Sequence, residues 1–146
     1  MSERHLSFYL IDVFIAIDKI KRYTQPFNDA QSLLYNDIHW DATIRELEII
    51  GEATNKILHL TGDASKEKRR IVNFRNQIVH GYFGINENIV WDVIQSKLND
   101  LHDDLFKLID EQKIDLTEAL ESAETENSYN KEVLSTLAHI RKNTSC

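Results

Sequence analysis

Residues 86–110, NENIVWDVIQSKLNDLHDDLFKLID, carry the clearest helical pattern of the chain. Asn86 precedes the pattern, and an asparagine at this position can cap a helix by accepting a hydrogen bond from a free backbone N–H. Apolar side chains then recur every three or four residues, which places them in one stripe along a helix, at Val90, Val93, Ile94, Leu98, Leu101, Leu105 and Leu108. The segment therefore predicts a long amphipathic helix.

The same spacing predicts two long helices in the first part of the chain. The first carries its stripe from Leu6 onward and ends near Thr24, because Pro26 disfavours a helical conformation at the residue before it. The second runs from His39 to about Leu60, and its stripe contains Ile44, Leu47, Ile50, Thr54, Ile57 and Leu58.

Gly51 lies inside the second predicted helix, where a glycine costs about 1 kcal/mol relative to alanine. We take it as the mark of a close helix crossing rather than of a site. Residues 61–63, Thr-Gly-Asp, predict the end of that helix, and Ser65 can cap a third. The third helix is expected to end at Gly81 or soon after, and its stripe is Ile71, Phe74 and Ile78.

The fold class predicted by these patterns is all-α. Four glycines and one proline leave few places to break a helix, and the alternation typical of strands is scarce. We expect an antiparallel bundle of four main helices over residues 1–110, with a short helical turn within 27–38, and a C-terminal helical extension over 111–146. In the extension, Asp115 and Glu118 predict a capping box for a short helix, and a last helix carries Val133, Leu134, Leu137 and Ile140.

The composition excludes several classes of protein. With 146 residues, 42% hydrophobic and 28% charged, the chain is expected to form a single domain with one core. It has no run of about 18 uncharged apolar residues, so no membrane span is predicted, and the charges at Asp12 and Asp18 interrupt any secretory signal. A cytoplasmic location is therefore expected. Cys146 is the only cysteine, which excludes an intrachain disulfide and a structural thiolate zinc site, and no metal site is predicted because no ligand spacing occurs among His5, His39, His59, His102 and His139.

The third predicted helix runs into residues 75–86, RNQIVHGYFGIN. Five residues at about 100° each put Arg75 and His80 some 140° apart around a helix, so their side chains need a helix end or a second subunit to converge. Gly81 can supply the helix end. An arginine offers a planar fork of donors to phosphate oxygens, and a histidine can transfer protons near neutral pH. The alternative is structural: a histidine favoured by the helix dipole, an arginine paired with a carboxylate, and Tyr82 in the core.

Charge is unevenly distributed along the chain, although the net charge is −7. Residues 66–75, KEKRRIVNFR, contain five basic side chains and one acidic one, next to the motif. Such a run is either a solvated surface or a patch that binds nucleic acid, with Lys66, Lys68, Arg69 and Arg70 as its candidate residues. Glu48 and Glu52, one turn apart on the second predicted helix, are either a catalytic carboxylate pair or part of a solvated or salt-bridged face.

The motif and its surroundings resemble the HepT-like toxins, a branch of the HEPN superfamily. Their signature is an arginine and a polar residue, then after a few residues a histidine, one further residue and a tyrosine. Arg75, Asn76, His80 and Tyr82 fill these places. The run IRELEIIGEA, residues 44–53, and the first helix are also similar, so the resemblance covers roughly residues 6–110. The chain departs from the family in LTGDASKEKRRIVNF, which lacks a frequent proline- and tryptophan-containing segment, and in the tail.

The resemblance implies a toxin of a two-gene toxin–antitoxin pair whose partner is a minimal nucleotidyltransferase, MNT. It implies a metal-independent, cofactor-free endoribonuclease that acts as a homodimer and cleaves RNA through attack of the ribose 2′-OH. His80 would be the general acid or base, Arg75 would neutralise phosphoryl charge, Asn76 would support it, and Tyr82 would accept AMP from the antitoxin. The alternative is a non-catalytic helical partner that binds a nucleotide or other substrate for a minimal nucleotidyltransferase.

Overall fold

The computed structural model describes residues 2–62, 66–80 and 86–144. Every regular element in these ranges is helical, which confirms the all-α prediction. None of the helices within them is long and apolar enough to cross a membrane.

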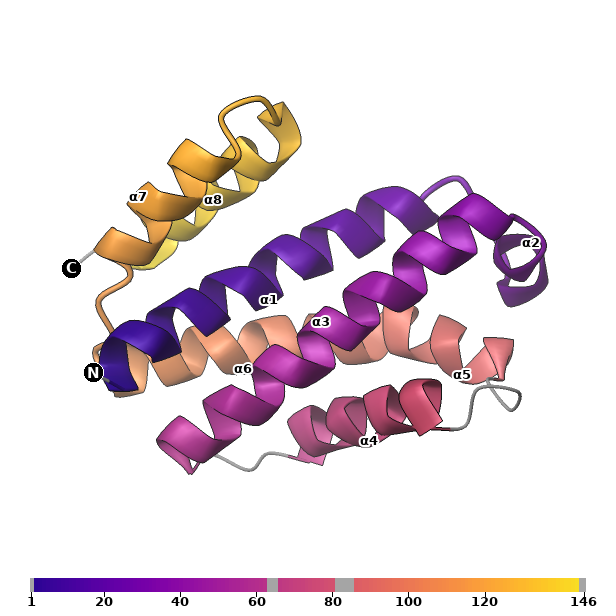
Figure 1. The fold of residues 1–146 in the computed structure, drawn as a ribbon, viewed down its shortest axis with the longest axis horizontal. Coiled ribbons are helices and arrows are strands. Elements are labelled where there is room, and N and C mark those ends of the chain that lie inside the picture. Colours follow the sequence, from indigo (N-terminus) through magenta and orange to yellow (C-terminus); the bar gives the residue numbers. More distant parts are fainter. Residues whose placement is uncertain (1, 63–65, 81–85, 145–146) are drawn as a thin grey trace.

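Helices α1 (Ser2–Thr24) and α3 (Asp37–Thr61) form the centre of the molecule and pack against each other along much of their length (Figure 1). α1 ends where the sequence predicts, and there the Oγ1 of Thr24 donates a hydrogen bond to the carbonyl of Ile20 at 2.8 Å. The apolar stripes of both helices face each other in one buried core that contains Leu10, Val13, Phe14, Ile17, Leu47, Ile50 and Ile57.

Caps set the ends of α3. The side chain of Asn36 accepts a hydrogen bond from the backbone N–H of His39, so α3 begins at Asp37, two residues before the predicted start. Gly62 ends the helix with a left-handed φ of 68°, as the Thr-Gly-Asp stop predicts. The short α2 (Ala30–Leu34), also predicted, precedes α3 and is capped by Asp29.

Helix α4 (Lys66–His80) packs against α3 and buries Ile71 and Phe74. The predicted cap at Ser65 and the predicted end at Gly81 lie outside the described residues. Asn86 caps the next helical run, as predicted, by accepting a hydrogen bond from the N–H of Asn88.

That run is a single periodic helix in the sequence but three helical segments in the structure. It consists of α5 (Glu87–Asp92), the π-helical turn η1 (Val93–Lys97) and α6 (Leu98–Glu111). A π turn inserts extra chain into an α-helix and rotates the later side chains around the helix axis. Apolar spacing does not reveal such a turn, because apolar residues are buried on both sides of it.

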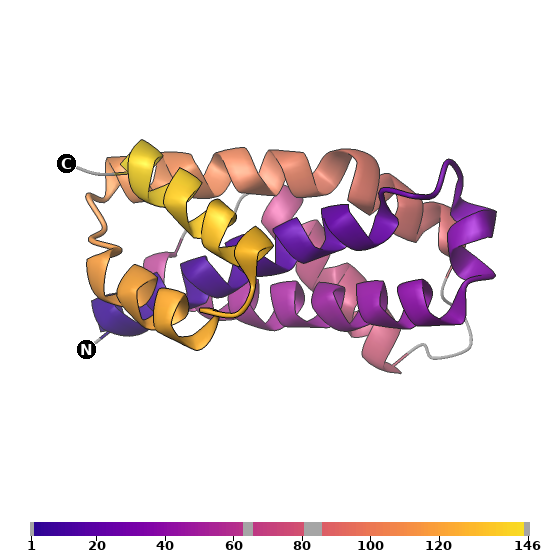
Figure 2. The same ribbon diagram turned by 90° about the horizontal axis from the view of Figure 1, so that it is seen from above.

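Helices α7 (Thr117–Glu126) and α8 (Lys131–Thr144) form a pair that lies along α1, on the side away from α4 (Figures 1 and 2). Arg141 of α8 holds both carboxylate oxygens of Glu124 of α7 at 2.9 Å. The predicted capping box places Asp115 directly before the helix, and this position is wrong, because α7 begins at Thr117 and Leu116 precedes it. The carboxylate of Asp115 instead accepts hydrogen bonds from the N–H and the hydroxyl of Thr117. The predicted boundary between residues 1–110 and the extension stays a prediction.

Candidate active site

Gly51 allows α3 and α4 to approach each other closely. A Cβ atom added to Gly51 would overlap Cβ and Cγ of Arg75 and would lie 3.2 Å from its Cδ. Any larger side chain at this position would therefore have to displace Arg75 or separate the two helices. The prediction that Gly51 marks a close helix crossing is confirmed. The residue that packs against Gly51 there is Arg75, the arginine of the motif.

The guanidinium of Arg75 is held by two neighbours. Its Nη2 donates to Oε1 of Glu52 at 2.7 Å, and its Nη1 donates to Oδ1 of Asn76 at 3.1 Å. The Nε atom is buried and has no hydrogen-bond partner among the described residues. The side chain is 24% exposed, whereas that of Glu52 is 65% exposed. Arg75 therefore rests against Gly51 with its orientation set by a carboxylate and an amide.

A polar pocket of 290 Å³ opens beside this contact and is lined by Gly51, Glu52, Asn55, Lys56, Val72, Arg75 and Asn76. The sequence patterns did not identify Asn55, Lys56 or Val72 as part of a site. Helical spacing could have identified two of them, since Asn55 and Lys56 lie three and four residues after Glu52 and therefore share its face of α3. The pocket combines two cationic groups and two amides with one carboxylate, which suits it to an anionic ligand.

The structure describes the other predicted site residues only in part. His80 is the last residue of α4, but its side chain is not described, and Tyr82 lies outside the described residues. The convergence of Arg75 and His80 stays a prediction. Of the two carboxylates considered as a catalytic pair, Glu52 is salt-bridged to Arg75, in agreement with the structural alternative.

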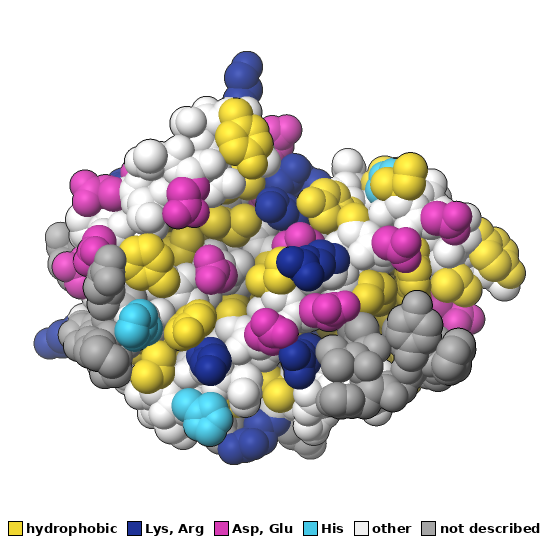
Figure 3. All heavy atoms as spheres, viewed as in Figure 1, with side chains coloured by type: hydrophobic (Ala, Val, Ile, Leu, Met, Phe, Trp, Pro, Cys, Tyr) yellow, Lys and Arg dark blue, Asp and Glu magenta, His cyan; other side chains and the backbone are white. Residues whose placement is uncertain are grey.

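The candidate RNA-binding residues all belong to α4. Arg69 and Arg70 are exposed, and the side chains of Lys66 and Lys68 are not described. On the face made by α3 and α4, acidic and basic side chains are interleaved (Figure 3). Within the described ranges, no group of three or more histidine, cysteine, aspartate or glutamate side chains could hold a metal ion.

Comparison with known proteins identifies the family. Residues 14–108, which include Gly51 and the whole motif, match the family model described as ribonuclease HepT-like. "Putative RNase MJ1380" from Methanocaldococcus jannaschii is 30% identical over 101 residues, which are 65% of this chain and 88% of the relative. "Probable ribonuclease HepT" from Thermococcus cleftensis is 29% identical over 107 residues, or 68% of this chain and 92% of the relative. No solved structure gives a significant match. This chain belongs to the HepT-like ribonuclease family.

Proposed function

We propose that this protein is the toxin of a toxin–antitoxin pair and that it cleaves RNA without a metal ion. The observation that carries the proposal is the setting of Arg75, whose guanidinium is held over Gly51 by Glu52 and Asn76 at the edge of a polar pocket. An arginine fixed in this way loses little entropy when it binds a phosphate oxygen. Membership of a family of ribonucleases supports RNA as the substrate.

The reaction uses the ribose of the substrate as the nucleophile. The 2′-OH loses its proton to a base, its oxygen attacks the adjacent phosphorus, and the bond from phosphorus to the 5′-oxygen breaks as that oxygen takes up a proton. His80 serves as the general acid or base in these transfers, and Arg75 balances the charge on the phosphoryl oxygens. Asn76 keeps the guanidinium in place through its bond to Nη1. The product is a cyclic phosphate.

The site is completed by a second copy of the chain. Arg75 and His80 are about 140° apart around a continuous helix, so the two positions do not share one face of α4. A homodimer that brings two motifs together supplies the arginine and the histidine from facing helices. The exposed Arg69 and Arg70, with Lys66 and Lys68 on the same helix, then extend the cationic surface along the path of the RNA.

The test is cleavage of a fluorescently labelled RNA by the purified protein in EDTA. We expect activity without added metal and no activity in His80→Ala. The matched control is His59→Ala, which removes an exposed histidine near the end of α3. Loss of wild-type activity in EDTA would contradict the metal-independent mechanism, and full activity in His80→Ala would contradict the role of His80.

We further propose that a minimal nucleotidyltransferase neutralises the toxin by transferring AMP to Tyr82. The phenol attacks the α-phosphorus of ATP and displaces pyrophosphate, which leaves a bulky anion where RNA phosphates bind. Incubation with the partner, ATP and magnesium should add AMP to Tyr82 and reduce cleavage in parallel. Tyr82→Phe should remain active and escape neutralisation, whereas Tyr129→Phe, which alters a tyrosine that is 80% exposed elsewhere, should behave as wild type. Binding to the partner with no RNA cleavage would favour the non-catalytic alternative.

A further inference from the structure

A second pocket, of 440 Å³, lies between α1, α6 and α8. It shares no lining residue with the pocket beside Arg75, and α8 and α4 lie on opposite sides of the molecule (Figure 1). Its volume is within the range of pockets that hold small organic molecules. One wall comes from α8, which lies beyond residues 14–108 of the family match. The pocket therefore depends on a part of the chain that the family match does not include.

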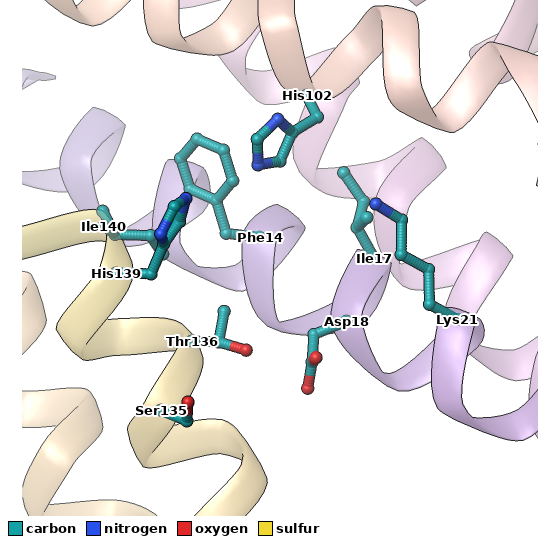
Figure 4. Close-up of a pocket in the computed structure, with 9 residues that line it drawn as sticks. All are labelled: Phe14, Ile17, Asp18, Lys21, His102, Ser135, Thr136, His139 and Ile140. Atoms are coloured by element: carbon teal, nitrogen blue, oxygen red, sulfur yellow. The ribbon is translucent and has the colours of Figure 1, made fainter. Parts of the chain in front are cut away.

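One side of this pocket is aromatic. Phe14 is buried between His102 of α6 and His139 of α8, and its ring centroid lies 5.5 Å from that of His102 in an edge-on arrangement (Figure 4). Phe106 continues the cluster, 4.9 Å from His102 and 6.5 Å from His139. Ring edges and faces of this kind favour a flat aromatic ligand.

Hydroxyl groups and one lysine line the rest of the pocket. Ser135 and Thr136 face it from α8, and neither hydroxyl has a hydrogen-bond partner within the described part of the chain (Figure 4). Asp18 also lines it, but its Oδ2 accepts from Nε of Arg22 at 3.0 Å, so that its charge is balanced. Lys21 has no carboxylate within ion-pair distance among the described residues. The uncompensated charge of the pocket is therefore that of Lys21, whose amino group points toward His102 and away from the two hydroxyls (Figure 4).

The region next to the pocket is acidic. An adjoining hollow of 450 Å³ shares His102 and His139 and adds Asp103, Lys107 and Asp110. Asp103 lies close to His102, with 3.4 Å between its Oδ1 and the Nδ1 of the imidazole. An anionic group is thus repelled from this hollow and attracted to the part of the pocket near Lys21.

We propose that the pocket between α1, α6 and α8 binds a small organic anion that carries a flat aromatic ring. The anionic group, a phosphate or a carboxylate, lies at the amino group of Lys21, which donates hydrogen bonds to it. The ring lies against His102 and His139. This site is separate from the proposed RNA-cleaving site and does not depend on it.

The first experiment titrates the full chain with phenyl phosphate and follows the imidazole signals by NMR. We expect saturable shifts at His102 and His139 and none at His59, which lies on α3 outside the pocket. Phenol and inorganic phosphate each lack half of the ligand and should bind at least about tenfold more weakly. Benzylamine has the same ring with the opposite charge, and tighter binding of benzylamine than of phenyl phosphate would overturn the proposal.

Variants separate this site from its surroundings. Lys21→Ala should weaken the binding of phenyl phosphate by about tenfold, as expected for a charged hydrogen bond. Lys19→Ala is the matched control. Lys19 lies on the same helix, but its charge interacts electrostatically with Glu46 of α3, so this variant should bind phenyl phosphate as wild type does. Arg75→Ala should also bind normally, whether or not RNA cleavage is found. The absence of a saturable shift, or equal binding by Lys21→Ala, would refute the site.

Discussion

Gly51→Ala tests whether the close approach of α3 and α4 holds the arginine of the motif in place. Alanine gains about 1 kcal/mol of helix propensity over glycine in a helix interior. Against this gain, the new Cβ would overlap Cβ and Cγ of Arg75, and overpacking of this kind costs about 1–3 kcal/mol. We therefore expect a net loss of about 0–2 kcal/mol in the free energy of unfolding.

A double-mutant cycle removes the contribution of helix propensity. Arg75→Gly deletes the two atoms that the new methyl group would meet, so Gly51→Ala should be tolerated in that background. The coupling free energy between the two changes should be about 1–3 kcal/mol, which is the full cost of the overlap. Urea unfolding followed by circular dichroism measures all four proteins.

RNA cleavage provides a second measurement on the same variants. If Arg75 acts on the phosphate, Gly51→Ala should reduce cleavage under conditions where the variant is still folded, because the displaced guanidinium loses its position beside Glu52. The control is Asp41→Ala, which changes an exposed residue of the same helix that lies outside this pocket. A Gly51→Ala protein more stable than wild type by the full propensity gain, with zero coupling to Arg75, would refute the close crossing.

Three further predictions concern single charges. Glu52→Ala should lower the free energy of unfolding by about 0.2–1 kcal/mol in urea, because its pair with Arg75 is largely exposed, and a larger loss would indicate a buried interaction. Burial raises the pKa of Glu46, so its contribution to stability is present below the ordinary carboxyl pKa of about 4.3 and is lost as the pH rises through its raised value. Glu46→Gln should therefore gain stability relative to wild type as the pH rises above about 4.3 and the carboxyl of Glu46 ionises, and unfolding midpoints that change in parallel would contradict this. Arg141→Met should cost about 0.2–1 kcal/mol through loss of its paired bonds to Glu124, and hydrogen exchange should increase in α7 and α8 before it does in α3.

The sequence by itself predicted the helical class and most helix ends. Helical periodicity and caps depend on residues three or four positions apart, so Asn86, Gly62 and Pro26 carry their signals locally. The roles of the motif residues came from the resemblance to the HepT-like family, and they stay a prediction. The π turn η1 and the register of Asp115 were not predicted, since both depend on how the neighbouring segments pack.

The tertiary structure alone decided what surrounds the motif arginine. Glu52 and Arg75 are 23 positions apart, and their contact depends on the place where α3 and α4 cross. The absence of a side chain at Gly51 permits that crossing, but only the folded structure shows that Arg75 lies opposite it. The pocket at Lys21 likewise exists because α8 packs along α1. Contacts of this kind join residues whose separation along the chain carries no periodic signal, because helix packing is set by the shapes of two whole surfaces rather than by the spacing within either one.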